Sequence, residues 1–345
     1  MKSIRLSIIG FGVVGQGLAE LVASKQELLR QQFDLDVTLV SVANRRHGFI
    51  YRETGLDIPL LLELAARHRP LTEHPGITHW AQPLDGLLAT GADILAEATG
   101  TNLRDAEPGM SHIRGALTHG IHVITANKGP VALAAHELLV LAKQRNLQLR
   151  MESTVMAGTP VISTLREGVA GASVKSIRGI LNGTTNYILS AMASGRDYAD
   201  VLAEAQAQGY AEADPTADVE GYDAVAKILI LAALVFGQTL RPAEVVRQGI
   251  THITRNQMLQ ALKEGKRIKL ISSLFFDEEN QLQARVEPMA LPEYEVLAQV
   301  EGVTNALTFQ ADTLSQVTIV GPGAGRLQTG QGLLADLITV SRTMA

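Results

Sequence analysis

Short apolar runs alternate with helix-like stretches over the first 150 residues, and this alternation restricts the fold more than any other feature of the sequence. Five runs have the length and composition of buried strands, and they span residues 4–10, 36–43, 91–100, 120–128 and 147–153. Residues 13–30 and 130–146 lie between such runs and are expected to be helices. Buried strands that alternate with helices predict a parallel, doubly wound sheet with its ligand at the carboxyl ends of the strands.

The pattern changes after about residue 150 and predicts a second domain. Longer strands are expected at residues 172–181, 266–276, 282–288 and 306–320, and helices at 186–194, 197–208 and 222–236. A length of 345 residues fits two domains. We therefore expect an α/β protein with a doubly wound, Rossmann-type dinucleotide-binding domain at 1–150, an α+β domain with a mixed or antiparallel sheet at 151–315, and a C-terminal segment at 316–345 that returns to the first domain.

Composition argues against several classes of function. The formal net charge is −5 and no basic tract stands out, which argues against a nucleic-acid partner. The longest apolar run is too short to span a bilayer, and no cleavage site follows the apolar N-terminus, so we expect no membrane partner. The sequence has no cysteine, which excludes disulfides, iron–sulfur clusters and a thiol nucleophile and fits a cytoplasmic location.

Gly10, Gly12 and Gly15 form a GxGxxG motif that follows the first expected strand and opens the first expected helix. The first glycine allows a tight turn, the second lets a pyrophosphate approach the backbone, and the third lets helix and strand pack closely. The N-terminus of the helix then faces the phosphates. In this context the motif predicts dinucleotide binding rather than a simple tight turn.

The second expected strand ends with Asn44, Arg45 and Arg46. Chains that bind the free ribose of NAD have an acidic residue there, about 20 residues beyond the glycine motif. Arginines pair with phosphate. The sequence therefore predicts NADP(H) as the preferred cofactor, with NAD(H) as the second choice. The alternative is a solvated arginine pair in a loop.

Polar residues end two neighbouring strands at the edge where a nicotinamide is expected. Thr99 and Gly100 end one strand, and we expect them to lie against the nicotinamide or its ribose. Lys128 follows the next strand and is expected to point into the same cleft. A surface lysine that closes a strand by chance is the alternative for Lys128.

Residues 209–237 combine a cluster of carboxylates with one lysine at the start of a strongly apolar helix. Asp223 and Lys227 are four residues apart and share one helix face. A lysine at the mouth of a buried helix is partly desolvated, which eases loss of its proton and suits a proton shuttle. The surplus acids would hold an ammonium group of a substrate. The alternative is a surface ion pair with first-turn acids facing the helix dipole.

Two turns remain open from the residues alone. In the turn at residues 152–160, Thr159 or Gly158 would cap a helix that begins near Pro160. Alternatively, Glu152 and backbone carbonyls of this turn would hold a hard cation. The spacing of the residues favours the first interpretation, an ordinary turn that caps a helix. At residues 182–184, the choice lies between a capped helix start and a substrate-binding turn.

Six segments together resemble homoserine dehydrogenases, and the resemblance covers essentially the whole chain. They are "GFGVVG" at 10–15, "TANKGPVA" at 125–132, "ESTVMAGTPVIS" at 152–163, "LNGTTNYIL" at 181–189, "GYAEADPTADVEGYDAVAKI" at 209–228 and "GPGAG" at 321–325. The resemblance implies reversible reduction of L-aspartate 4-semialdehyde to L-homoserine with NAD(P)H, in the biosynthesis of threonine, methionine and isoleucine. It also implies a homodimer formed through the second domain.

The resemblance also implies residue roles. Lys227 and Lys128 match the catalytic lysines. Substrate binding is implied for Glu212, Asp223, Asp218, Asn182, Gly183 and Thr184. For cofactor binding we expect Gly10, Phe11, Gly12, Val13, Val14, Gly15, Asn44, Arg45, Arg46, Thr99, Gly100, Lys128, Gly209, Gly321 and Gly323. A sodium ion is implied at Glu152, Val155, Ala157 and Thr159. This cation site is therefore the expected function of the turn, in place of the ordinary turn that spacing alone favoured.

Other expectations concern regulation and alternative functions. Many bacterial relatives carry a C-terminal ACT domain, and we expect none here, because the sequence stops at Ala345 soon after "GPGAG". Another two-domain oxidoreductase would share the glycine motif and the region of Lys128 but lack the 209–228 block. A sensor protein that binds NADP(H) without chemistry is the third alternative.

Overall fold

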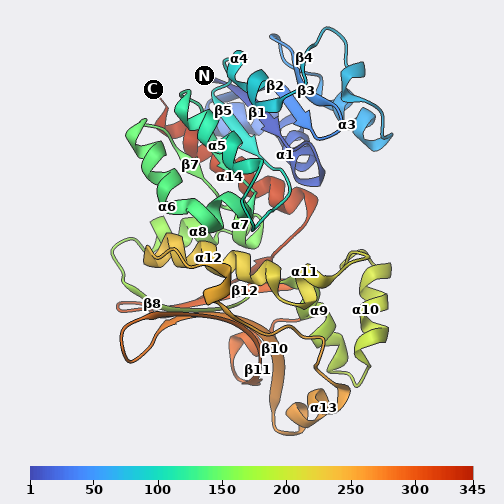
Figure 1. Cartoon of the computed structure of the whole chain (residues 1–345), viewed down its shortest axis with the longest axis vertical. Coiled ribbons are helices and arrows are strands. Elements are labelled where there is room, and N and C mark those ends of the chain that lie inside the picture. The colour runs from blue at the N-terminus through green and yellow to red at the C-terminus, as the bar shows by residue number, and fades with distance from the viewer. Residues whose placement is uncertain (345) are drawn as a thin grey trace. The chain divides into compact units, whose positions relative to one another are not determined.

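The computed structural model describes residues 1–344 and divides the chain into two compact units. The first unit comprises Met1–Gly158 together with the segment that starts at Gly325, and the second comprises Thr159–Ala324. The boundaries expected from the sequence were residues 150 and 315. Figure 1 labels the elements, and each unit is described by itself below.

The first unit is built on a seven-stranded sheet with the strand order β4-β3-β2-β1-β5-β6-β7. The strands are β1 Lys2–Ile9, β2 Leu35–Asn44, β3 Gly48–Tyr51, β4 Thr78–Trp80, β5 Ile94–Glu97, β6 His122–Thr125 and β7 Leu149–Arg150. Strands β2, β1, β5, β6 and β7 are parallel, which confirms the predicted doubly wound sheet. Strands β3 and β4 add an antiparallel edge that the sequence did not predict.

Both helices expected in the first unit are present with changed bounds, beside others whose positions the sequence analysis did not give. They are α1 Val13–Ser24, α2 Gln26–Phe33, α3 Ile58–Ala66, η1 Leu71–Glu73, α4 Pro83–Ala89, α5 Gly109–Thr118, α6 Lys128–Gln144, α7 Ser153–Met156 and α14 Arg326–Thr343. The single helix expected at 13–30 is two helices that part at Lys25. Helix α6 starts at Lys128 rather than Pro130, because the Asn127 side chain accepts a hydrogen bond from the backbone N–H of Gly129.

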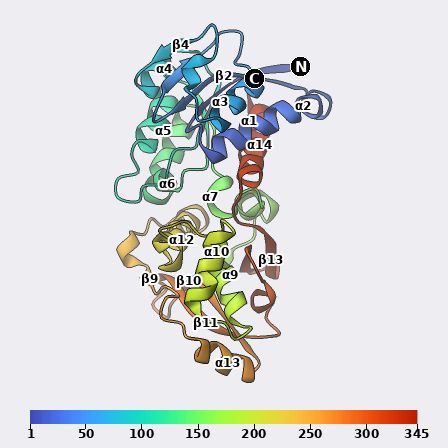
Figure 2. The ribbon, with the colours of Figure 1, turned by 90° about the vertical axis from the view of Figure 1, so that its right-hand side faces the viewer.

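Helix α14, from the C-terminal end of the chain, packs against α1, as both views of the ribbon show (Figures 1 and 2). Glycines make this approach close. A Cβ atom at Gly17 of α1 would lie 2.2 Å from the backbone oxygen of Arg326, and one at Gly330 of α14 would lie 2.7 Å from the backbone of Gly17. Leu333 and Leu337 of α14 are fully buried in the same core as Leu18. The C-terminal helix is thus an integral part of the first unit.

The second unit contains a six-stranded mixed sheet with the order β13-β12-β8-β10-β11-β9. The strands are β8 Val174–Ile180, β9 Val246–Arg247, β10 Lys266–Phe276, β11 Leu282–Pro292, β12 Thr304–Ala311 and β13 Ser315–Pro322. Pairing is antiparallel except between β11 and β9. The single strand expected at 306–320 was wrong, because the chain turns at residues 312–314 and pairs β12 with β13.

The remaining helices of the second unit include the one that the acidic block precedes. The elements are α8 Val161–Ser163, the π-helical turn Thr164–Gly168, α9 Gly183–Met192, α10 Tyr198–Ala207, α11 Thr216–Val219, α12 Tyr222–Phe236, η3 Pro242–Glu244, α13 Arg255–Lys263 and η4 Val296–Gln299. Helix α12 has the predicted bounds. Gly221 and Gly237 flank it in the left-handed conformation that glycine adopts without strain.

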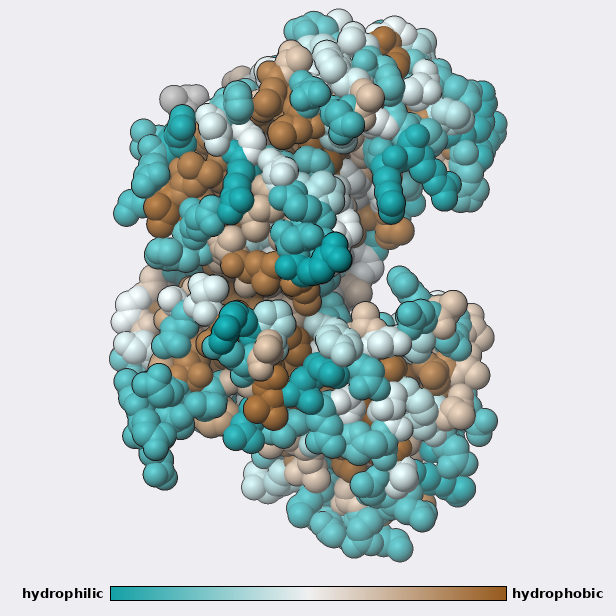
Figure 3. Space-filling view, viewed as in Figure 1, coloured by the Kyte–Doolittle hydropathy of each residue, from teal (hydrophilic) through white to brown (hydrophobic). Residues whose placement is uncertain are grey.

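Apolar side chains on the face drawn in Figure 3 are scattered among hydrophilic ones that cover most of it. None of the helices within residues 1–344 has the length and hydropathy needed to cross a membrane.

The contact between α1 and α14 generates a stability prediction. Helix propensity favours Gly17→Ala by about 1 kcal/mol, but the new methyl group would overlap backbone atoms that cannot move away. Overpacking of this kind costs about 1–3 kcal/mol. We expect Gly17→Ala to lower the free energy of unfolding, measured by urea denaturation. Gly168→Ala is the control, because a Cβ there meets only a methyl group at 3.5 Å. Equal stability of the two variants would contradict the close packing.

Candidate active site

The turn between β1 and α1 has the geometry that each glycine of the motif requires. Gly10 has φ +101°, and a Cβ there would lie 2.3 Å from the backbone of Ala98. A Cβ at Gly15 would lie 2.4 Å from the backbone oxygen of Gly10, whereas none of the described atoms lies within 4 Å of a Cβ placed on Gly12. Space for a phosphate is therefore left at Gly12. No side chain caps α1, so the N–H groups of its first turn face outward for an anion.

The neighbouring motif residues differ in exposure. Phe11 is buried at 3% exposure and belongs to the core of the unit, Val13 is 66% exposed, and Val14 is half-buried. Only Val13 and Val14 therefore present side-chain surface beside this turn, while Phe11 contributes its backbone.

The predicted arginines lie in the turn that joins β2 to β3. Asn44 organises this turn, because its Oδ1 accepts hydrogen bonds from the backbone N–H groups of Arg46 at 3.1 Å and His47 at 2.7 Å. Arg45 and Arg46 are both exposed. The turn thus presents two guanidinium groups at the carboxyl end of β2, where a ribose 2′-substituent lies in doubly wound folds.

The carboxyl ends of β5 and β6 carry a connected polar cluster. Thr99 is half-buried, and its hydroxyl accepts a hydrogen bond from Asn127 Nδ2 at 3.0 Å. Gly100 is exposed beside it. Lys128 is the first residue of α6 and is half-buried. The first unit therefore brings together Thr99, Gly100 and the backbone of Lys128 at one edge of its sheet.

The second unit buries Lys227 beside one carboxylate. The residue is 6% exposed, and its Nζ lies 2.9 Å from Asp223 Oδ2 and donates to the backbone oxygen of Leu181 at 2.5 Å. The pair spans one turn of α12, as the spacing predicted. A surface ion pair, the alternative interpretation, is wrong, because the lysine side chain is 8% exposed and that of its partner 18%.

Asn182 joins two of the acidic residues to this lysine. Its Nδ2 donates to Asp218 Oδ1 at 2.7 Å and to Asp223 Oδ2 at 3.0 Å. Its Oδ1 accepts from the backbone N–H of Thr185 and caps α9. Burial raises the pKa of the Asp218 carboxyl above its ordinary value, the Asn182 hydrogen bond opposes this shift, and the negative charge of Asp223 adds to it. One amide therefore serves both as the cap of α9 and as a bridge between two carboxylates, which confirms the capped helix start, while substrate binding by this turn stays a prediction.

The other residues proposed for this region lie at different distances from the lysine. Thr184 donates its hydroxyl hydrogen to the backbone oxygen of Tyr210, next to Gly209. A Cβ at Gly183 would lie 2.6 Å from the backbone oxygen of Val303. Glu212 is exposed on the loop between α10 and α11, and its backbone oxygen accepts from Gln206. The structure thus links the 182–184 turn to the 209–212 loop, without a direct contact from Glu212 to Lys227.

Gly321 and Gly323 lie at the end of β13, where the backbone is closely packed. A Cβ at Gly321 would lie 2.5 Å from Thr159 Oγ1, and one at Gly323 would lie 2.0 Å from Asn305 Nδ2. Thr159 donates its hydroxyl hydrogen to the backbone oxygen of Pro322. The N-cap residue of α8 is Pro160 and no side-chain hydrogen bond caps this helix, so the predicted cap by Thr159 or Gly158 was wrong. A side chain at Gly321 would have to displace the Thr159 side chain, and one at Gly323 the Asn305 side chain.

The residues proposed for a cation lie in and around α7. Glu152 is 5% exposed, and its backbone N–H donates to Asp336 at 2.8 Å. Ala157 has φ 51° and ψ −119°, a strained conformation for a residue with a Cβ. Gly332 permits it, because a Cβ there would lie 2.7 Å from the Ala157 oxygen. Glu152, Val155 and Ala157 belong to the first unit, and Thr159 begins the second. Within the first unit, Glu152, Val155 and Ala157 lie in one short segment that offers a carboxylate and backbone oxygens, the ligand types that hard cations prefer.

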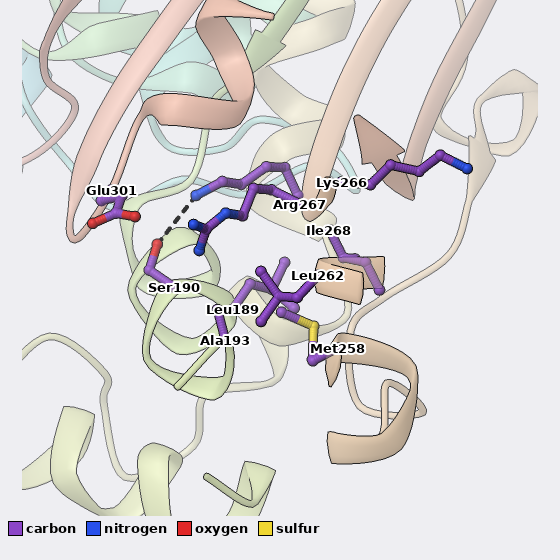
Figure 4. A pocket seen from close by; sticks show the side chains of 10 residues that line it. Leu189, Ser190, Ala193, Met258, Leu262, Lys266, Arg267, Ile268 and Glu301 are labelled. Atoms are coloured by element: carbon purple, nitrogen blue, oxygen red, sulfur yellow. Dashed lines mark hydrogen bonds between the residues drawn. The ribbon is translucent and has the colours of Figure 1, made fainter. Parts of the chain in front are cut away.

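A second buried lysine, Lys269, was not singled out from the sequence. Its Nζ donates to Val300 O at 2.6 Å, Asn186 Oδ1 at 3.1 Å and Ser190 Oγ at 3.2 Å, and burial lowers its pKa to about 8. It lines the pocket of Figure 4, where the dashed line marks the bond to Ser190. The pocket holds about 10 Å³, room for one water molecule at most. Lys269 therefore has a structural role, and Lys227 remains the better candidate for chemistry.

Comparisons with known proteins agree with this geometry over both units. Residues 160–338 match the family model described as homoserine dehydrogenase, and residues 10–152 match homoserine dehydrogenase, NAD binding domain. An NAD(+)-dependent homoserine dehydrogenase of Pseudomonas canavaninivorans is 39% identical, over 99% of this chain and 97% of its own length.

Solved structures give the same result. A putative homoserine dehydrogenase from Archaeoglobus fulgidus has a TM-score of 0.87 and 34% identity, with coverage of 98% of this chain and 99% of its own. A hyperthermophilic archaeal homoserine dehydrogenase in complex with NADPH has a TM-score of 0.85 and 29% identity, with coverage of 100% and 99%. The chain therefore belongs to the homoserine dehydrogenase family, whose members are NAD(P)-dependent oxidoreductases.

Proposed function

We propose that this protein reduces L-aspartate 4-semialdehyde to L-homoserine, with NADP(H) preferred over NAD(H), and so supplies the biosynthesis of threonine, methionine and isoleucine in the cytoplasm. The observation that carries the proposal is the buried ammonium of Lys227, held by Asp223 and by the backbone of Leu181. Burial of a cation next to one carboxylate on an apolar helix lowers stability unless the pair is well bonded. An active site is where such a cost is commonly retained.

Lys227 is the residue that we assign to the reacting oxygen. An ammonium group has three N–H bonds, and the structure directs two of them to Asp223 and Leu181. The third would donate to the carbonyl oxygen of the semialdehyde, where negative charge develops during reduction. Proton transfer by such a group contributes about 10²–10⁴-fold. Lys128, which belongs to the cofactor-binding unit, is assigned to the same proton transfer to the substrate oxygen.

The carboxylates are assigned to the polar end of the substrate. Asp218 and Asp223 share the Asn182 amide, and burial, together with the negative charge of Asp223, raises the pKa of Asp218 and disfavours its ionised form. An ammonium group of the substrate would supply the missing positive charge. Glu212 on its exposed loop, together with Gly183 and Thr184, would also bind the polar end of the substrate. The semialdehyde and homoserine both carry an α-amino group, so the same residues serve both directions.

The dinucleotide fits the first unit. The residues that would hold it are the backbone of the 10–15 turn at the pyrophosphate, Arg45 and Arg46 at a 2′-phosphate, and Thr99 and Gly100 at the nicotinamide. Gly209, Gly321 and Gly323 of the second unit would add backbone contacts. When bound, the cofactor supplies the hydride, and the protein supplies position, charge and the proton.

A monovalent cation and a second copy of the chain complete the proposal. Sodium is assigned to the backbone oxygens of Val155, Ala157 and Thr159 with Glu152, supported by the strained backbone of Ala157. The homodimer is assigned to the sheet of the second unit. Tyr294 and Val296 line a depression on that sheet and are 87% and 49% exposed. Exposed large apolar side chains of this kind are typical of subunit contacts.

The role of Lys227 is tested by Lys227→Met, which keeps the length of the side chain and removes its charge. We expect kcat for homoserine oxidation to fall by about 10²-fold or more, while the dissociation constant of NADP⁺ changes little. Asp223→Asn should lower kcat/KM, and the two losses should be far from additive because the residues act as a unit.

Lys266→Met is the matched control for that experiment. It also breaks a lysine–glutamate pair, at 3.1 Å to Glu264, but on the exposed surface. Such a pair contributes about 0–1 kcal/mol of stability, and its loss should not alter turnover. Near-native turnover of Lys227→Met would show that the buried pair is structural and would leave Lys128 as the proton donor.

Cofactor preference is tested by Arg45→Ala, alone and combined with Arg46→Ala. A charge-assisted hydrogen bond contributes about 1.5–3 kcal/mol, which is roughly 10- to 150-fold in affinity. We expect the single variant to weaken NADP(H) binding by that factor and to leave NAD(H) nearly unchanged. Arg67→Ala is the control, because Arg67 is an exposed arginine of the same unit that pairs with Glu63. Equal losses for both cofactors would rule out a 2′-phosphate contact.

A further inference from the structure

One buried carboxylate, Glu97, has no part in the function proposed above. Glu97 ends β5 and has no exposed surface. Its Oε1 accepts hydrogen bonds from the backbone N–H and the hydroxyl of Thr99, and His112 Nδ1 lies 3.4 Å away. Its Oε2 has no hydrogen-bond partner among residues 1–344. A buried carboxylate that is only half satisfied lowers the stability of the fold, and an apolar residue would fill the space at lower cost.

The hydrogen bonds of Glu97 belong to a closed ring that joins the ends of β5 and β6. Thr99 Oγ1 donates to Glu97 and accepts from Asn127 Nδ2 at 3.0 Å. The backbone N–H of Asn127 donates to Thr125 Oγ1 at 3.0 Å, and that hydroxyl donates to the backbone oxygen of Glu97 at 3.0 Å. The ring therefore returns to the residue at which it starts.

An ionised carboxylate can only accept hydrogen bonds, and this sets the direction of the bonds that depend on it. The Thr99 hydroxyl must point its hydrogen at Glu97, so it can only accept from the amide of Asn127. The backbone N–H of Gly129 donates to Asn127 Oδ1 at 3.0 Å and caps α6, which leaves Asn127 Nδ2 to donate to the Thr99 hydroxyl. Lys128 is the first residue of that helix. Glu97 thus orients the Thr99 hydroxyl and, through it, anchors the Asn127 side chain that caps α6.

We propose that Glu97 is a positioning residue, which acts through Thr99 and Asn127 to hold the nicotinamide-facing threonine and the helix start that carries Lys128. This inference rests on the proposed function, which assigns Thr99 to the nicotinamide and Lys128 to the proton. His112 supports the carboxylate from α5 and is 5% exposed. The alternative is a purely structural contact between Glu97 and His112, which would affect stability alone.

The test uses Glu97→Gln and Thr99→Val in the full chain. Glutamine keeps the shape but presents a donor as well as an acceptor, so the direction of the bonds is no longer determined. Valine keeps the shape of threonine and removes the hydroxyl that links Glu97 to Asn127. If Glu97→Gln does not fold, Thr99→Val alone still tests the link. Thr90→Val is the matched control, because Thr90 is buried in the same unit and its hydroxyl donates only to Leu87.

Two readouts separate positioning from stability. The first is hydrogen exchange of the Gly129 amide without cofactor, which we expect to become at least tenfold faster in both variants, with mid-helix amides of α6 unchanged. The second is steady-state oxidation of homoserine, for which we expect kcat to fall about tenfold or more while KM for homoserine stays within twofold. Thr90→Val should change neither.

The outcomes distinguish this inference from the proposed function. If the Gly129 amide of Thr99→Val exchanges at the wild-type rate, the hydrogen-bonded ring does not hold the start of α6. That result would overturn the inference. A fall in thermal stability with exchange and kcat both unchanged would also overturn it, in favour of the structural contact. If the wild-type protein fails to oxidise homoserine while both variants still loosen Gly129, the proposed function fails and the positioning role stands.

Discussion

The ammonium of Lys227 is buried on a helix that is otherwise apolar, and the second unit is arranged around the groups that compensate its charge. Asp223 lies one turn earlier on the same helix, and the backbone oxygen of Leu181 comes from the end of β8. Removal of the Asp223 carboxylate would leave the buried ammonium without a counter-charge, which costs about 3–5 kcal/mol. The start of α12 and the end of β8 are therefore held together, and Asn182, the next residue, brings in Asp218 and begins α9. The start of α12, the end of β8 and the start of α9 thus lie together around the ammonium group of Lys227.

The first unit differs because its glycine turn leaves open space at Gly12, where a ligand would bind, instead of filling it with side chains. Gly10 and Gly15 pack against backbone atoms, and Gly12 faces open space at the uncapped start of α1. Behind this turn, α14 packs against α1 through Gly17 and Gly330. The rigid elements thus support a loop whose own surface is left for a ligand, as expected where binding groups lie on loops over a scaffold.

The predictions from sequence succeeded where a local signal exists and failed where contacts are remote. Helix α12 has its predicted bounds because an apolar run lies between Gly221 and Gly237. The β12–β13 hairpin was missed because its turn contains no glycine or proline, and Ser315 takes the positive φ of 54° there. Glu97 was not singled out from the sequence, since its partner His112 is distant in the sequence and lies on another element. The ring through Thr99 and Asn127 could not be found from spacing, because it depends on side-chain directions at two strand ends.

The central claim is that the buried lysine and its carboxylates act on an aldehyde–alcohol pair that carries an amino group. The most direct measurement is the absorbance of the reduced nicotinamide, followed for the wild-type protein with NADPH and L-aspartate 4-semialdehyde and with NADP⁺ and L-homoserine. The account predicts saturable turnover in both directions, and none with a 4-carbon alcohol that lacks the amino group. Binding of the cofactor without turnover of either amino acid would contradict it.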